Sequence, residues 1–211
     1  MSTGHQPTSL QFTEDMKGFV TFGETDYQRG HDEGKKNGTS FMFHLTIKMD
    51  DVDRFVAEPE HEGRADGYVH CDALGGQRPV EGGIFNLFVD AKEPKRKLML
   101  YRLFFLDGEG NPYTMSGFKD VKEDSGFNPM EIWKDTSTLY TKIFRGRVSA
   151  DEEANAEIVA AGIIIILKAD FAKQMTTFKT EGPRPVEAIA KFGKLFMGSL
   201  WEVYGPSSKS E

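Results

Sequence analysis

The sequence predicts a mainly β protein: an antiparallel barrel, lipocalin-like or related, of about eight strands with a C-terminal amphipathic helix. Strand-like segments of roughly ten residues recur along the chain, separated by turn residues. The connections are short and glycine-rich, as at Gly75-Gly76 and 107–112, which suits hairpins better than the crossover helices of a parallel sheet. Closure into a barrel or stacking as a sandwich would shield the strand edges.

The clearest strand is Ser40–Lys48, because Phe41, Phe43, Leu45 and Ile47 alternate with more polar residues. Asp26–Gly38 precedes it and is predicted to be a glycine- and charge-rich loop. The other predicted strands are Lys17–Gly23, Gly67–Leu74, Val80–Val89, Lys97–Leu106, Tyr113–Val121, Thr136–Val148 and Glu157–Lys168. The last contains the apolar run Ile158–Leu167, which would aggregate if exposed, so we expect the C-terminal helix to cover it.

Three helices are predicted. Asp50–Ala57 has acidic capping residues and ends before Pro59, and Asp170–Phe178 is a second short segment. Pro185–Tyr204 is the clearest, with proline in its first turn, Gly205-Pro206 after its end and apolar residues at helical spacing. We therefore expect one domain over residues 12–205, flanked by disordered tails at 1–11 and 206–211.

Composition excludes several classes of protein. The chain has 211 residues with 26 basic and 33 acidic side chains, a net charge of −7, which disfavours nucleic-acid binding. The single cysteine, Cys71, excludes an internal disulfide and a multi-cysteine zinc site, and we expect it to be a small buried hydrophobe. The N-terminus lacks a signal-peptide pattern, and no apolar run is long enough to span a membrane, so a cytoplasmic location is expected.

Candidate site residues are few. His44 and His70 lie on the less apolar faces of two strands, and Asp72 follows His70 on the same face, as in an acid–base pair. If these faces line the lumen, Asn86 and Arg102 join them; otherwise the same faces form the outside of the barrel. Ligand binding is thus predicted for His44, His70, Asn86 and Arg102, and for Phe43 and Phe85, with His70, Asp72 and His44 as catalytic candidates.

Known cofactor and metal motifs are missing. No glycine-rich nucleotide fingerprint, GxSxG or HExxH occurs, so neither a cofactor nor a metal is predicted. Ser116 and Lys119 match an SxxK pattern, but inside a strand residues three apart point to opposite faces, so the match is treated as accidental.

Several phrases together resemble a known family. They are Met16–Val20, Phe43–Ile47, Asp51–Val56 with Pro59–His61, Gly82–Phe88, Asp135–Tyr140 and Leu200–Gly205. Over most of residues 12–205 the chain resembles the extra, non-flavin segment of bacterial cholesterol-oxidase-like glucose–methanol–choline oxidoreductases. The resemblance implies a sterol, lipid or long-chain alcohol context and a flavin-dependent oxidase as a possible partner. The chain lacks the flavin-binding fold, so no flavoenzyme active-site residue is carried over.

The 17 phenylalanines and nine methionines are compatible with an apolar ligand cavity as well as with an ordinary core. The leading hypothesis is an accessory or binding domain for a sterol, fatty acyl chain or long-chain alcohol, without catalytic activity of its own. The first alternative is a cofactor-free isomerase, lyase or cyclase that uses a His/Asp pair. The second is an interaction module whose helix presents Phe196, Met197 and Trp201 to a partner.

Overall fold

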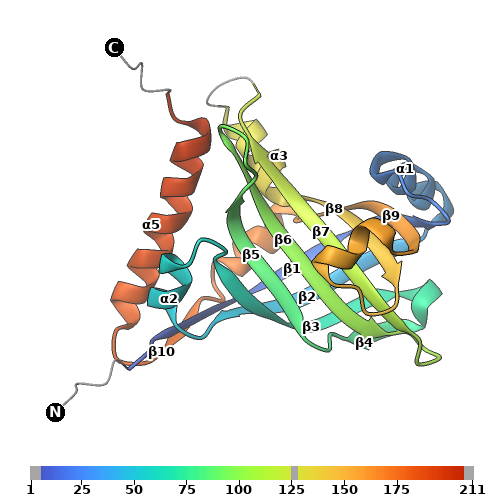
Figure 1. Ribbon diagram of the computed structural model, residues 1–211, viewed down its shortest axis with the longest axis horizontal. Coiled ribbons are helices and arrows are strands. Elements are labelled where there is room, and N and C mark those ends of the chain that lie inside the picture. The colour runs from blue at the N-terminus through green and yellow to red at the C-terminus, as the bar shows by residue number, and fades with distance from the viewer. Residues whose placement is uncertain (1–5, 125–127, 207–211) are drawn as a thin grey trace.

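Eight antiparallel strands form a closed barrel, as the sequence predicts (Figure 1). The structure is a computed structural model and describes residues 6–124 and 128–206. In order around the barrel the strands are β1 (Ser9–Phe22), β2 (Ser40–Met49), β3 (Glu62–Cys71), β5 (Gly83–Asp90), β6 (Arg96–Leu106), β7 (Pro112–Lys122), β8 (Thr138–Arg145) and β9 (Ile158–Ile165). Pairing of β9 with β1 closes the sheet. Two short strands, β4 (Gly76–Pro79) and β10 (Lys179–Glu181), extend β3 and β1.

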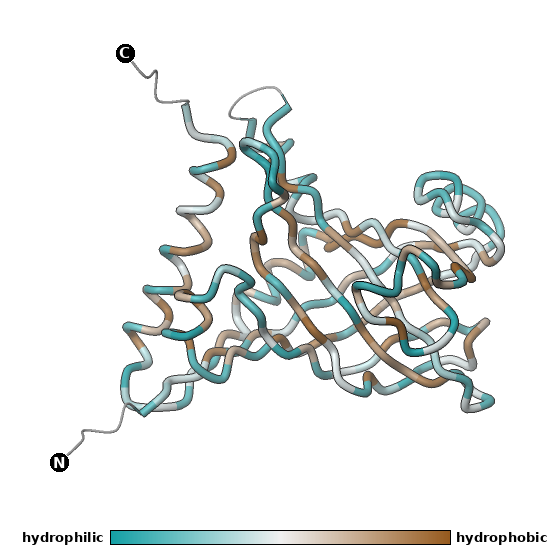
Figure 2. The backbone as a smooth tube through the Cα atoms, viewed as in Figure 1, coloured by the Kyte–Doolittle hydropathy of each residue, from teal (hydrophilic) through white to brown (hydrophobic). Residues whose placement is uncertain are grey.

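The period-two pattern places one face of each strand in the core. In β2, Phe41, Phe43, Leu45 and Ile47 are fully buried, while the residues between them are partly exposed. Figure 2 shows hydrophobic positions recurring along the barrel strands. Cys71 belongs to this core as a buried free thiol, as predicted, and burial raises its pKa.

The first strand is much longer than its predicted segment. β1 starts at Ser9 rather than Lys17, and Leu10 and Gln11 pair with β2 on one side and β10 on the other. Residues 9–11 of the predicted tail therefore belong to the sheet. Positions 1–5 and 207–211 of the predicted tails lie outside the described residues.

Five α-helices surround the barrel within the described ranges. They are α1 (Tyr27–Asn37), α2 (Val52–Ala57), α3 (Pro129–Ser137), α4 (Lys168–Gln174) and α5 (Pro185–Tyr204), with short 3₁₀ turns η1 (Asp72–Leu74) and η2 (Ala150–Asn155). The helix α5 has the predicted bounds, whereas α4 ends before the predicted Phe178. The predicted strand Thr136–Val148 is wrong at its start, because α3 runs through Ser137 before β8 begins.

The segment predicted as a loop, Asp26–Gly38, is the helix α1. The Asp26 side chain accepts from the Arg29 amide at 2.8 Å as the N-cap, and Gly38 ends the helix in the left-handed region with φ 74°. Its glycines allow close packing: a Cβ on Gly30 would lie 2.1 Å from the Ala161 carbonyl oxygen. The same glycines and the hydrophilic sequence seen in Figure 2 hid the helix from pattern analysis.

The apolar strand β9 is covered by α1 and not, as expected, by the C-terminal helix. The outer side of β9 packs against α1, whereas α5 contacts α2, β1, β10, β6 and β7. The C-terminal helix is therefore not the cover of Ile158–Leu167.

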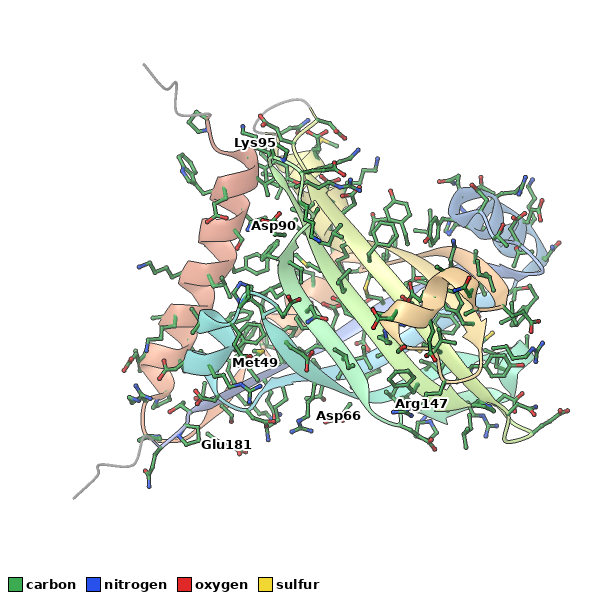
Figure 3. The ribbon with its side chains drawn as sticks, viewed as in Figure 1. Met49, Asp66, Asp90, Lys95, Arg147 and Glu181 are labelled. Atoms are coloured by element: carbon green, nitrogen blue, oxygen red, sulfur yellow. The ribbon has the colours of Figure 1, made fainter. Side chains whose placement is uncertain are left out.

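Polar contacts hold α5 at both ends. Near its N-terminus, Arg184 contacts Asp53 of α2 at 2.7 Å. Near its C-terminus, the Tyr204 hydroxyl donates to Asp135 of α3 at 2.7 Å, and Lys95 donates to the Gly205 carbonyl at 3.0 Å. Lys95 lies at the end of the β5–β6 hairpin beside this end of the helix (Figure 3). The helix is thereby fixed across one end of the barrel.

Candidate functional site

An apolar cavity of about 680 Å³ lies between one end of the barrel and the helices α3, α4 and α5. Its strand-borne wall includes Phe12 of β1, Phe85 and Leu87 of β5 and Met99 of β6. The helices contribute the opposite wall, with Ile132, Trp133, Phe171, Phe192, Phe196 and Leu200. The end of the barrel is thus roofed by helices, and the space beneath them is not filled by side chains.

Aromatic contacts join the strand wall to the helical wall. The Phe12 ring stacks on Phe178 with centroids 5.1 Å apart, and lies 6.0 Å from Phe192 of α5. Phe85 meets Phe12 edge-to-face at 6.5 Å. Contacts of this kind add to the energy of apolar burial and fix the relative positions of the rings.

The mouth of the cavity lies between α4 and α5. Met175, Ile189 and Met197 line the cavity, yet their exposed fractions are 55%, 49% and 65%. Side chains that border both the cavity and solvent mark where a ligand would enter. Two of the three residues predicted to form an interaction patch, Met197 and Trp201, are exposed, whereas Phe196 packs edge-to-face on Phe88.

The cavity contains one buried group of polar side chains, from Glu14, Tyr101 and Lys119. The Tyr101 hydroxyl donates to Glu14 Oε1 at 2.8 Å, and Lys119 Nζ lies 3.4 Å from the same oxygen. All three side chains are nearly inaccessible to solvent. Lys119 Nζ also lies 5.2 Å from the centre of the Tyr101 ring. Ion pairs and hydrogen bonds are needed here, because a buried charge without partners is very costly.

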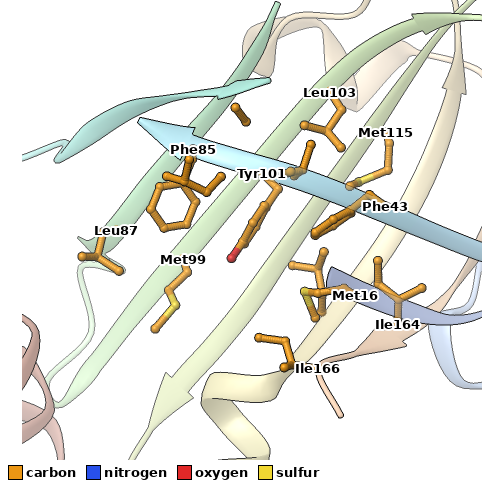
Figure 4. Packing of buried hydrophobic residues seen from close by; sticks show 14 of the residues in the cluster. Met16, Phe43, Phe85, Leu87, Met99, Tyr101, Leu103, Met115, Ile164 and Ile166 are labelled. Atoms are coloured by element: carbon orange, nitrogen blue, oxygen red, sulfur yellow. The ribbon is translucent and has the colours of Figure 1, made fainter. Parts of the chain in front are cut away.

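These polar residues connect opposite walls of the barrel. In the strand order, β1, which carries Glu14, lies four steps from β6, which carries Tyr101, in either direction. Tyr101 lies between Phe43 of the filled part of the barrel and Phe85 of the cavity wall, at centroid distances of 5.7 and 5.0 Å (Figure 4). The polar group therefore lies where the packed core gives way to the cavity.

Burial changes the acid–base properties of this group. It lowers the pKa of Lys119, an effect that the neighbouring Glu14 opposes. Burial and the adjacent Glu14 carboxylate both raise the pKa of Tyr101 well above its usual value. Tyr101 accordingly remains a neutral hydrogen-bond donor at physiological pH.

A fourth side chain reaches the group from α4. Gln174 Nε2 donates to Glu14 Oε2 at 3.3 Å, so the carboxylate accepts from three different residues. Gln174 lines the cavity, and its Oε1 is buried without a hydrogen-bond partner in the described structure.

The predicted site omits Glu14, Tyr101, Lys119 and Gln174, although the sequence carries a signal for Glu14 and Lys119. Glu14 continues the buried alternation Leu10, Phe12, Glu14, Met16, and Lys119 lies between Gly117 and Val121 on the buried face of β7. A charged residue at an apolar position of a period-two pattern predicts a buried polar site. Lys119 and Ser116 do point to opposite faces, as the rejection of the SxxK match requires.

Five of the six predicted ligand-binding residues do not line the cavity, and four of these five lie on the outer face of the barrel. His44 is on the outer face of β2, where its Nδ1 lies 2.5 Å from Asp15 Oδ1 and its ring stacks on Tyr68. Burial raises the pKa of Asp15, but the hydrogen bond and charge of His44 outweigh this and hold it below its usual value.

His70 and Asp72 do form a pair, with Nε2 and Oδ1 3.1 Å apart, but it is exposed on the outer surface. Asn86 donates to the Glu60 carbonyl, and Arg102 contacts Glu153 of η2 at 2.6 Å. These residues occupy the polar faces of their strands, which the barrel turns outward. Ligand binding by His44, His70, Asn86 and Arg102 was predicted on the condition that these faces line the lumen, and the structure does not meet that condition.

The two predicted aromatic residues point inward. Phe85 lines the cavity, whereas Phe43 is fully buried in the packed part of the barrel and contacts Tyr101. Only Phe85 of the predicted set borders the cavity.

A metal centre and a membrane-spanning helix are both absent from the described residues. Among residues 6–124 and 128–206, no group of three or more His, Cys, Asp or Glu side chains is arranged to hold a metal ion. Within the same ranges, no helix has the length and hydrophobicity of a membrane span. No protein-family model, curated protein or solved structure matches the chain significantly. The resemblance to the cholesterol-oxidase-like segment, and the oxidase partner it implies, therefore stay predictions.

Proposed function

We propose that this chain is a binding or accessory domain that holds an apolar small molecule, of sterol, fatty acyl or long-chain alcohol type. The observation that carries the proposal is the cavity of about 680 Å³, whose largely apolar walls end at one buried polar group. Its volume falls within the range of about 300–1,000 Å³ typical of small-molecule sites. A few polar groups in a mostly apolar pocket give a ligand one preferred orientation.

Affinity and orientation would come from different residues. Phe12, Phe85 and Phe192 offer rigid aromatic surface, and burial of ligand surface against them contributes about 25 cal/mol per Å². Met99, Met175 and Met197 adapt to irregular shapes, which suits a flexible chain or a fused ring system. The polar end of the ligand would lie at the buried polar group of Glu14, Tyr101 and Lys119.

The enzyme alternative built on His70, Asp72 and His44 receives no support from the cavity. These side chains are on the outer surface, so a substrate held in the cavity would not meet them. General acid–base catalysis requires hydrogen-bond reach between catalyst and substrate.

Native mass spectrometry of freshly purified protein, followed by solvent extraction, tests for a bound lipid or sterol. A second experiment locates the site with a matched pair of helix variants. Gly193 lines the cavity and Gly198 does not, and a Cβ at either position would meet no atom within 4 Å. Both Gly193→Leu and Gly198→Leu replace a glycine within α5, which favours the helix.

We expect the fluorescent apolar probe N-phenyl-1-naphthylamine to bind the wild-type protein and the Gly198→Leu variant equally. Gly193→Leu places a side chain in the cavity and should weaken binding about tenfold, because one misplaced side chain in a filled site typically costs at least 1 kcal/mol. Equal binding by all three proteins would place the probe elsewhere and contradict the proposal. Failure of the wild-type protein to bind the probe, sterols or fatty acids would contradict it as well.

A further inference from the structure

The Gln174 side chain has a fixed orientation with one unsatisfied atom. A carboxylate accepts hydrogen bonds and donates none, so the amide nitrogen must be the atom that faces Glu14 Oε2 at 3.3 Å. The amide oxygen then has to point away from Glu14. It is buried and has no hydrogen-bond donor in the described structure, an arrangement that native proteins rarely tolerate.

The neighbouring Lys119 amine has the opposite imbalance, because it has more hydrogen-bond donors than acceptors to receive them. An ammonium carries three N–H donors, and among the described residues the one hydrogen bond of Lys119 Nζ goes to Glu14 Oε1 at 3.4 Å. That distance is long for a charge-assisted contact. Lys119 and Gln174 both border the cavity and share the Glu14 carboxylate. Two residues that line the cavity thus carry complementary groups: Gln174 has an acceptor that lacks a donor, and Lys119 has a donor with spare capacity.

This pair of requirements selects among apolar ligands. An ionised fatty acid only accepts hydrogen bonds, so it would leave Gln174 Oε1 unsatisfied and would face the negative charge of Glu14. An ether, an ester or a ketone likewise accepts only. A hydroxyl group both donates and accepts, and it carries no charge.

We infer that the ligand of this cavity carries a neutral hydroxyl at its polar end, which donates to Gln174 Oε1 and accepts from Lys119 Nζ. The inference rests on the proposed function and narrows its ligand class to apolar alcohols. Tyr101 stays bound to Glu14 and keeps the carboxylate in place.

Three ligands of matched chain length test the inference: 1-dodecanol, 1-methoxydodecane and dodecanoate at pH 8, each measured by displacement of N-phenyl-1-naphthylamine. We expect dodecanol to bind about tenfold more tightly than the ether and the carboxylate, because only the alcohol pairs the buried amide oxygen. Gln174→Met keeps a side chain of similar length without the amide. It should remove the preference for the alcohol, so that dodecanol and the ether bind this variant with a ratio of affinities close to one.

The outcomes separate this inference from the proposed function. Equal affinity for alcohol and ether, or tightest binding of dodecanoate, would overturn the hydroxyl assignment while leaving an apolar binding site. A preference for the alcohol that persists in Gln174→Met would also overturn it. Absence of probe binding, or of displacement by any of the three ligands, would overturn both.

Discussion

The Tyr101 hydroxyl and the Glu14 carboxylate join opposite walls of the barrel through a 2.8 Å hydrogen bond, and both side chains are almost completely buried. Burial raises the pKa of Tyr101, so the hydroxyl keeps the proton that it donates. Without this bond, Glu14 would retain only the longer contacts to Lys119 and Gln174 at 3.4 and 3.3 Å. The bond is therefore the shortest described link between the two walls at the cavity.

Replacement of Tyr101 by phenylalanine tests the energetic value of this link. We expect Tyr101→Phe to lower the free energy of unfolding by about 1–3 kcal/mol, because a buried carboxylate loses a donor. Urea unfolding measures the change. Tyr113→Phe is the matched control, since the Tyr113 hydroxyl meets the exposed Arg145 at 3.4 Å, and it should cost less than about 0.5 kcal/mol. Equal costs for the two variants would mean that the Tyr101–Glu14 bond adds nothing.

Helix propensity alone predicts that alanine in place of Gly30 stabilises α1, whereas the close packing of α1 against β9 predicts the opposite. Alanine favours a helix over glycine by about 1 kcal/mol, yet a Cβ on Gly30 would lie 2.1 Å from the Ala161 carbonyl oxygen. We expect Gly30→Ala to destabilise the protein by about 1–3 kcal/mol and to lower its Tm. Gly193→Ala in α5, where the space is open, should instead raise the Tm. A rise in Tm for both variants would refute the close contact of α1 with β9.

Asp135 gives a pH dependence with a defined sign. Burial raises its pKa above the usual 3.8, although the hydrogen bond from Tyr204 opposes the change. Between pH 3.8 and the raised value, the folded protein binds more protons than the unfolded chain, so the stability contribution of Asp135 falls as pH rises. Asp135→Asn removes this effect. Wild-type stability relative to Asp135→Asn should therefore decrease from pH 3 to pH 7 in urea unfolding at each pH.

Asp72→Asn is the control for this series, because the Asp72 side chain is 92% exposed. The same pH series on this variant gives the baseline against which the change for Asp135→Asn is compared. A pH-independent difference for Asp135→Asn would show that burial does not shift the protonation of Asp135.

The exposed pair on the outer surface leads to a negative prediction. His70→Ala removes a side chain that is 41% exposed and contacts Asp72 across the outside of the barrel. We expect a change in unfolding free energy within about 0.5 kcal/mol and unchanged probe affinity. Loss of probe binding in His70→Ala would restore His70 as a candidate ligand-binding residue.

The barrel itself could be predicted because its evidence is local. Alternation in Ser40–Lys48 and the glycines at Gly75-Gly76 determine strand faces and turns within a few residues. The helices α1 and α3 were not predicted. The glycines of α1 have low helix propensity, and the strand-like residues at the end of α3 concealed where that helix stops. In α1 the glycines meet a packing requirement, and in α3 Thr136 and Ser137 belong to a helix although they introduce the strand β8.

The candidate site was harder to predict because it depends on which strand face turns inward and on contacts across the barrel. Glu14, Tyr101, Lys119 and Gln174 come from β1, β6, β7 and α4, and their sequence positions do not indicate that they meet. Alternation placed His44, His70 and Arg102 together on one class of face, and the structure turns that face outward. The alternation separates the two faces of each strand correctly but does not determine which face forms the lumen.

The pairing of β1 with β9 also constrains the order of folding. Lys17 pairs with Ile165, so the barrel closes only when two segments far apart along the chain meet, which is characteristic of slow folding steps. The polar group of the cavity contains Glu14, which precedes Lys17 in the sequence, and Gln174, which follows Ile165. A ligand that needs both residues recognises only the closed barrel. Its binding would therefore stabilise the closed barrel by mass action and would not stabilise any earlier stage of assembly.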